Sequence, residues 1–164
     1  MTDEQKPEQE KNSETLQDMV IKSITSEETK LSITGEPSIV EYETFNHRIK
    51  EYFLTKENIK QITEIVGQHK EKEEWLDVYI IEYNERKISE NYDRMSTKQG
   101  LLKEKQKKEF EGTLRLIIKD DYAVLIRSYN KEIESEANEV FKNLKKRGLK
   151  ELKFNPDKLS YELV

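Results

Sequence analysis

The sequence predicts an α+β domain in which an N-terminal helical hairpin packs on or beside a small, mostly antiparallel sheet that carries one or two helices. Three observations lead to this fold class. Two runs of strand-favouring residues, 113–118 and 122–127, flank a short turn. A helical pattern of apolar residues follows them at 130–147. A third apolar run of strand composition precedes them at 75–83.

Composition limits the number of domains and the compartment. The 164 residues amount to about one domain, and residues 37–164 are expected to form one globular unit. Charged residues make up 38% of the chain, against about 25% in typical domains, so part of the chain is expected to remain unpacked. The sequence has no cysteine, which excludes disulfides and thiolate chemistry. Without a membrane-span pattern or a secretion signal, a cytoplasmic protein with no membrane partner is expected.

Residues 1–36 are predicted to be a flexible acidic tail, because the segment opens with Glu, Gln, Lys and Ser and has nothing to bury before Leu16. Within it, Leu16, Met19, Val20 and Ile24 fall on one helical face. This face predicts a short helix that docks on the domain or on a partner, or a transient helix with no dedicated partner.

Residues 37–70 are predicted to form the helical hairpin. Ser38 and Glu41 match a capping box at its start, Thr55 is suited to cap the second helix, and Gly67 to end it. Two helices with so short a connection also suit a DNA-reading helix-turn-helix, but few side chains of the second helix fit base edges, so a packing role is preferred. The expected buried residues are Tyr42, Phe45, Ile49, Tyr52, Phe53, Ile59, Ile62, Ile65 and Val66.

Residues 75–83 are predicted to form a central strand, and residues 84–112 leave two models open. In the preferred model, 84–112 holds a crossover helix and the domain has the ferredoxin-like order β-α-β-β-α-β. In the second model, residues 88–95 form a strand that pairs back on 78–83, and a four-stranded meander precedes the last helix.

The segment 113–149 is predicted in most detail. If Asp120 and Asp121 form a two-residue loop, alternate residues of a hairpin share a face. One face then carries Leu114, Leu116, Ile118, Ala123 and Leu125, and the other carries Arg115, Ile117, Val124 and Ile126. In the following helix, Asn130 is the expected N-cap and Gly148 the expected left-handed residue after the end. Its apolar stripe is Ile133, Ala137, Val140, Phe141 and Leu144. Alternation at 149–154 and 159–163 predicts a closing strand or small hairpin.

Motifs for catalysis are missing from the sequence. It has no glycine-rich phosphate loop, and neither His47 nor His69 has metal-ligand spacing, so a solvated or capping role is expected for both. Asp120 and Asp121 are interpreted as turn residues. We therefore expect no catalytic residue, no metal and no cofactor.

Charge is unevenly distributed along the chain, with a net −9 over residues 1–97 and +4 over residues 98–164. The basic residues that could contact phosphates or an acidic partner are Lys103, Lys105, Lys107, Lys108, Arg115, Arg127, Lys142, Lys145, Lys146 and Arg147. Tyr79, Tyr83 and Tyr122 could stack on bases. The main hypothesis is a non-enzymatic protein-interaction or accessory module with a protein partner or a second copy of itself. The alternative is a nucleic-acid-binding protein that uses the basic half, with the acidic tail modulating binding.

Overall fold

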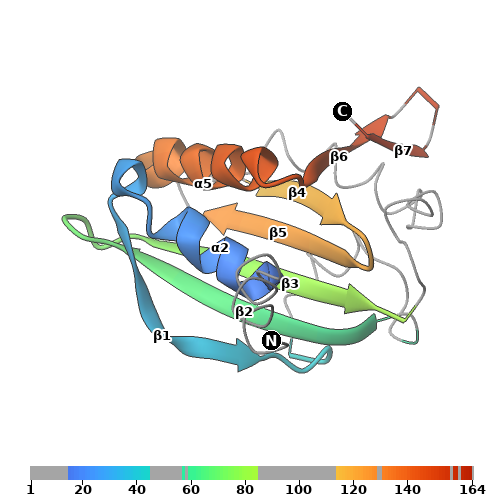
Figure 1. The fold of residues 1–164 in the computed structure, drawn as a ribbon, viewed down its shortest axis with the longest axis horizontal. Helices are drawn as coiled ribbons and strands as arrows, with labels where there is room; N and C mark the ends of the chain where they lie inside the picture. The colour runs from blue at the N-terminus through green and yellow to red at the C-terminus, as the bar shows by residue number, and fades with distance from the viewer. Residues whose placement is uncertain are drawn as a thin grey trace, which may run out of the picture.

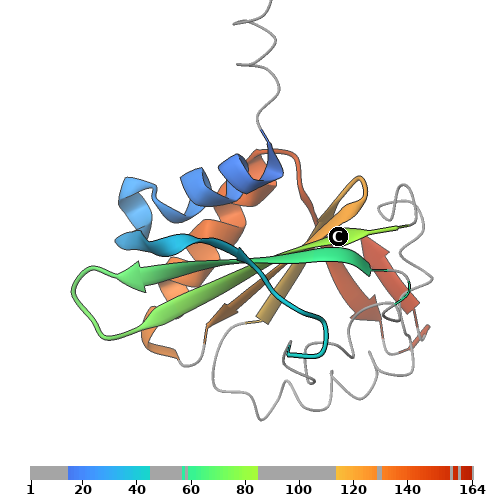
Figure 2. The ribbon, with the colours of Figure 1, turned by 90° about the horizontal axis from the view of Figure 1, so that it is seen from below.

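Within the residues that this computed structural model describes, seven antiparallel strands form one sheet and two α-helices lie over one of its faces (Figure 1, Figure 2). The described residues are 15–44, 57, 59–84, 114–128, 131–155, 157–158 and 160–163, with the backbone alone for 114, 115, 154, 160 and 161. The strands are β1 (Leu31–Ile39), β2 (Ile59–His69), β3 (Trp75–Tyr83), β4 (Leu114–Lys119), β5 (Tyr122–Ser128), β6 (Lys150–Asn155) and β7 (Ser160–Leu163). The helices are α2 (Leu16–Ile24) and α5 (Glu134–Lys146), with 3₁₀ turns at Glu27–Thr29 and Lys131–Ile133.

The strand order is β1-β2-β3-β5-β4-β6-β7, and each neighbouring pair is antiparallel. β3 therefore lies inside the sheet between β2 and β5, which confirms the predicted central strand. Both faces of the central strands are buried. The helix-covered face includes Leu76, Val78 and Ile117. The opposite face, which has no helix over it among the described residues and is called the helix-free face below, includes Ile81 and Leu125.

The helical hairpin predicted for 37–70 is wrong wherever the structure describes this segment. Residues 31–39 and 59–69 are the paired strands β1 and β2, and residues 45–56 and 58 lie outside the described residues. The spacing of Ile59, Ile62 and Ile65 fits a helix, yet in β2 Ile62 and Ile65 pack on opposite faces of the sheet, so the apolar residues of this strand do not alternate. The β-branched side chains of this run favour the strand.

Gly67 has a packing role inside β2 and does not end a helix. A Cβ atom at this position would lie 3.0 Å from Cγ2 of Ile24, so the glycine lets α2 approach the strand closely. α2 itself is capped by Thr15, whose Oγ1 accepts a hydrogen bond from the N–H of Asp18 at 3.1 Å. Ile24 is fully buried.

Residues 15–36 are a docked helix and a strand, so the predicted flexible tail is wrong over this part; residues 1–14 lie outside the described residues. Side-chain hydrogen bonds join α2 to α5, because Asn143 Nδ2 donates to the carbonyl of Ser23 at 3.1 Å and to Ser26 Oγ at 2.9 Å. The short apolar face around Val20 therefore docks on the domain itself.

The ferredoxin-like order is not observed. That order would place the last strand beside β3, but β2 occupies this edge of β3, and β6 pairs with β4 at the far side of the hairpin. In the second model, residues 88–95 would pair on 78–83, but both edges of β3 are occupied by β2 and β5, and 88–95 lie outside the described residues.

The hairpin and helix of 113–149 are confirmed. Lys119 pairs with Tyr122 across a two-residue loop, and the described side chains divide between the two faces as predicted. The stripe from Ile133 to Leu144 is buried. Gly148 has φ +99°, its N–H bonds to Lys145 O, and the N–H of Leu149 bonds to Leu144 O, which together form a Schellman motif. The predicted N-cap is wrong for α5, because this helix begins at Glu134 with Ile133 as its N-cap; Asn130 itself lies outside the described residues. The C-terminal hairpin is observed as β6 and β7.

Candidate interaction surface

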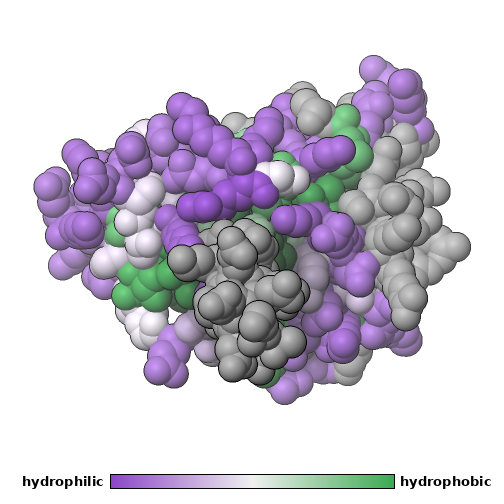
Figure 3. Space-filling view, in the orientation of Figure 1, coloured by the Kyte–Doolittle hydropathy of each residue, from purple (hydrophilic) through white to green (hydrophobic). Residues whose placement is uncertain are grey.

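Two side chains of the predicted basic cluster at the end of α5 contact other residues of the domain, and two others extend into solvent. Lys145 Nζ lies 3.9 Å from Glu151 Oε2 and 5.4 Å from the centre of the Phe141 ring, and Arg147 Nε donates to Ser23 Oγ at 3.3 Å. Lys142 and Lys146 are exposed. The outer side of α2 and α5 is mainly hydrophilic (Figure 3). Much of this positive charge therefore lies at the negative end of the helix dipole, where it stabilises the helix.

The other predicted basic residues do not extend this cluster within the described residues. Arg127 is 8% exposed and lies directly opposite Asp77 on the helix-free face of the sheet. The side chain of Arg115 is not described, and Lys103, Lys105, Lys107 and Lys108 lie outside the described residues.

The three predicted stacking tyrosines do not share a surface. Tyr79 and Tyr83 are 6% and 3% exposed and belong to the helix-free core. Tyr122 packs against the core of the helix-covered face. Bases stack on exposed rings, so these positions do not form a single stacking platform.

Tyr122 instead belongs to a polar row on the helix-covered face. Its hydroxyl lies 3.4 Å from Glu82 Oε2, which also accepts the ammonium of Lys60 at 3.5 Å. Burial and then the neighbouring Glu82 carboxylate raise the pKa of Tyr122 above 10.0. The phenol therefore stays protonated at neutral pH and acts as a hydrogen-bond donor, which does not suit a base or a nucleophile.

His69 forms a buried polar pair with Glu136. Its Nδ1 accepts hydrogen bonds from the N–H groups of Glu71 and Lys72, both at 3.0 Å, so its Nε2 carries the proton and donates to Glu136 Oε1 at 3.2 Å. The histidine side chain is 1% exposed. Ser135 Oγ donates to Glu136 Oε2 at 3.4 Å and not to the imidazole, so the three residues do not form an activated nucleophile. The pair fastens the β2–β3 turn to α5.

The most exposed large apolar side chain is at the outer edge of the sheet. Among the described residues, β1 has β2 on one side and no strand on the other. Ile39, the last residue of β1, is 68% exposed, well above the 43% of Trp75. The outer edge of such a strand can pair with another chain.

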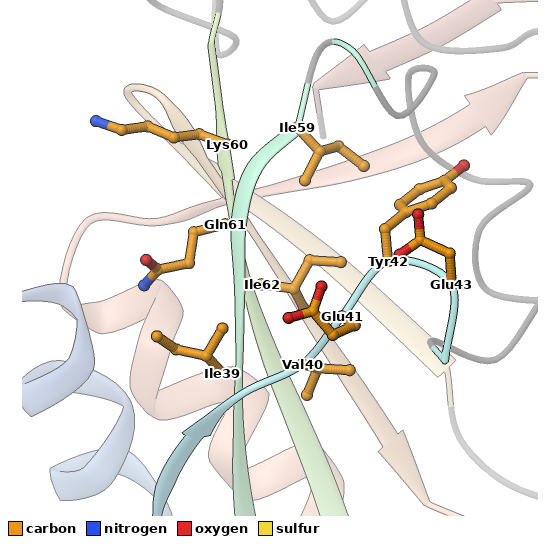
Figure 4. A pocket seen from close by; sticks show the side chains of 9 residues that line it. All are labelled: Ile39, Val40, Glu41, Tyr42, Glu43, Ile59, Lys60, Gln61 and Ile62. Atoms are coloured by element: carbon orange, nitrogen blue, oxygen red, sulfur yellow. The ribbon is translucent and has the colours of Figure 1, made fainter.

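A hollow of about 280 Å³ adjoins Ile39 (Figure 4). It lies between the segment after β1 and the start of β2. Figure 4 shows Ile39, Gln61 and Lys60 extending to one side of β2, with Ile59 and Tyr42 on the other. Its full lining is Ile39, Val40, Glu41, Tyr42, Glu43, Ile59, Lys60, Gln61 and Ile62. We define the edge site as this lining together with the outer edge of β1.

The edge site was not predicted from the sequence, because its residues lie in the segment predicted to be helical. Ile39 follows Pro37 and Ser38, a helix-start pattern, so it fits a helix unless β2 is recognised as a strand. The one available signal was the density of β-branched residues at 59–66.

Searches of protein-family models, curated proteins and solved structures found no match for this chain. Its function therefore has to be inferred from the surface itself. Among the described residues, no helix has the length and apolar character to cross a membrane, and no three or more potential metal-ligand side chains gather in one place.

Proposed function

We propose that this protein is a non-enzymatic protein-interaction or accessory module that binds its partner at the edge site. The observation that carries the proposal is Ile39, a large apolar side chain that is 68% exposed on the edge strand and adjoins a hollow. An edge strand presents unpaired backbone N–H and C=O groups, which an extended segment of a partner can pair with.

The polar groups of the described residues favour recognition over catalysis. His69 and Glu136 are buried and bonded to the turn and to each other. Tyr122 has a raised pKa and is bonded to Glu82. These groups are accounted for by their roles in holding the fold, whereas the fold of the described residues leaves Ile39 68% exposed.

A photo-crosslinking amino acid placed at position 39 tests the proposal in living cells. The control places the same amino acid at position 142, which is exposed on α5. We expect position 39 to crosslink a defined protein and position 142 to give no such product. Equal products from both positions, or none from position 39, would contradict the proposal.

The same experiment addresses the nucleic-acid alternative. Lys142 lies in the exposed part of the basic cluster, so a nucleic-acid-binding protein should crosslink nucleic acid from position 142. Under the interaction-module proposal, we expect no nucleic acid to be captured from position 39.

A further inference from the structure

The backbone at the end of β1 has groups that point away from the sheet. The N–H of Val40 donates to the carbonyl of Ile62 at 2.9 Å, so Val40 faces β2. Hydrogen-bonding direction alternates along an antiparallel strand, and the N–H and C=O of Ile39 therefore face outward, as does the N–H of Glu41. The carbonyl of Glu41 already accepts the N–H of Thr44 at 3.0 Å.

The available edge is short. The register passes from Thr34 opposite Val66 to Ser38 opposite Glu64, so β1 carries a bulge between these pairs. Within the bulge, Gly35 has φ +70° and Pro37 has no N–H to donate. A partner strand can therefore pair with Ile39 and Glu41 but cannot continue regularly along β1.

The hollow next to this edge suits one apolar side chain. Val40, Tyr42 and Ile59 line it and pack against the core of the helix-free face. A partner strand paired with Ile39 would carry side chains alternately to the two faces of the sheet, so one of them is directed toward this hollow.

Charge identifies the chemistry of the occupant. Among the described residues, the edge site and its immediate neighbours carry the carboxylates of Glu36, Glu41, Glu43 and Glu82 and one ammonium, that of Lys60, a net formal charge of −3. Lys60 is matched by Glu82 at 3.5 Å. A second copy of the chain would bring the same carboxylates against themselves, and a nucleic acid would bring phosphates, so both are disfavoured.

We infer that the edge site binds an extended, basic segment of a partner protein. Its backbone pairs with Ile39 and Glu41, one apolar side chain enters the hollow, and lysine or arginine side chains lie beside Glu36 and Glu41. This inference rests on the proposed function and names the class of partner for the same site.

Fluorescence anisotropy with synthetic peptides on the full chain tests it. The probe is an eight-residue peptide that alternates lysine with valine. One control alternates glutamate with valine, and a second is the lysine peptide with alternate backbone nitrogens methylated. We expect the lysine peptide to bind more weakly as salt rises, and both controls to fail.

Two matched variants locate the binding. Glu41→Lys should weaken the binding of the lysine peptide about two- to fivefold, as expected for the loss of a surface charge pair. Glu27→Lys makes the same charge change at an exposed residue of the Glu27–Thr29 turn and should leave binding unchanged. If the lysine peptide binds Glu41→Lys as well as the unaltered chain, or binds despite methylation, the inference is overturned.

The outcomes separate this inference from the proposed function. If the glutamate peptide binds as well as the lysine peptide, or no peptide binds while position 39 still crosslinks a defined protein, the partner class is wrong and the proposed function stands. A dimer in light scattering that Ile39→Asp abolishes would make a second copy the occupant and would also overturn the inference. If position 39 gives no crosslink and no peptide binds, both proposals fail.

Discussion

Replacing His69 by alanine removes three hydrogen bonds in one step, and the structure gives a basis for the size of the effect. Two of the bonds come from the backbone N–H groups of Glu71 and Lys72, at 3.0 Å each. Neutral bonds of this kind contribute about 1 kcal/mol each. The third joins Nε2 to the buried Glu136 carboxylate at 3.2 Å, and bonds to a charged group contribute about 1.5–3 kcal/mol.

The N–H groups of Glu71 and Lys72 lie near the surface and can bond to water in the variant. The loss of their two bonds to His69 therefore lowers the stability by less than the full value. We therefore expect His69→Ala to lower the free energy of unfolding by about 3 kcal/mol, most of it from the carboxylate left without its donor. Glu136→Gln keeps an oxygen that can accept from Nε2 and should cost only about 1 kcal/mol. Glu134→Gln changes an exposed acid in the same helical turn and should remain within about 0.5 kcal/mol of the unaltered chain.

Urea denaturation of His69→Ala, Glu136→Ala and the double variant measures the coupling between the two side chains. If the buried pair fastens the turn to α5, the double variant should be less destabilised than the sum of the single variants by about 1–3 kcal/mol. Additivity within about 0.5 kcal/mol would refute the reasoning, because it would mean that the two side chains do not interact in the folded protein.

Three further changes have defined outcomes. Burial and the Glu82 carboxylate raise the pKa of Tyr122 in the folded state, so its contribution to stability is complete below pH 10.0 and is lost as the pH rises through the raised pKa. Tyr122→Phe should therefore reduce the alkaline loss of stability seen in urea denaturation at a series of pH values. An unchanged slope would argue against the burial of the Tyr122 hydroxyl beside Glu82. In Gly67→Val, the new Cβ would lie 3.0 Å from Cγ2 of Ile24 and the rest of the valine side chain would add to this overlap. We expect the variant to be less stable by about 1–3 kcal/mol in the same assay. Full stability would show that α2 does not approach β2 as closely as the structure indicates. Asp120 has φ +53°, a left-handed conformation that costs a β-branched residue about 1–2 kcal/mol, so Asp120→Val should lower the free energy of unfolding by about that amount, and full stability would mean that the turn does not hold this conformation.

The parts of the fold that the sequence predicts well are those fixed by neighbours in the chain. The loop at Asp120 and Asp121 sets the register of β4 and β5, and Gly148 ends α5 with a left-handed residue. Turn composition and a C-terminal glycine are local signals with a local physical cause.

The parts that it predicts poorly depend on distant contacts. Ile62 packs on the helix-free face and Ile65 on the helix-covered face, so β2 has no alternation that would distinguish it from a helix. His69 and Glu136 are 67 positions apart, and neither has a neighbour in sequence that predicts the pair. Burial of Tyr79 and Tyr83 follows from the position of β3 inside a wide sheet, which a single strand pattern does not reveal.

The bulge in β1 has a consequence for assembly. A sheet edge that accepts one strand can in principle accept a long series of strands, and this is how cross-β fibrils grow. Here the kink between Thr34 and Ser38, with Pro37 inside it, interrupts the ladder that a long incoming strand would need. The same edge can therefore hold one short segment of a partner while offering no continuous template for polymerisation.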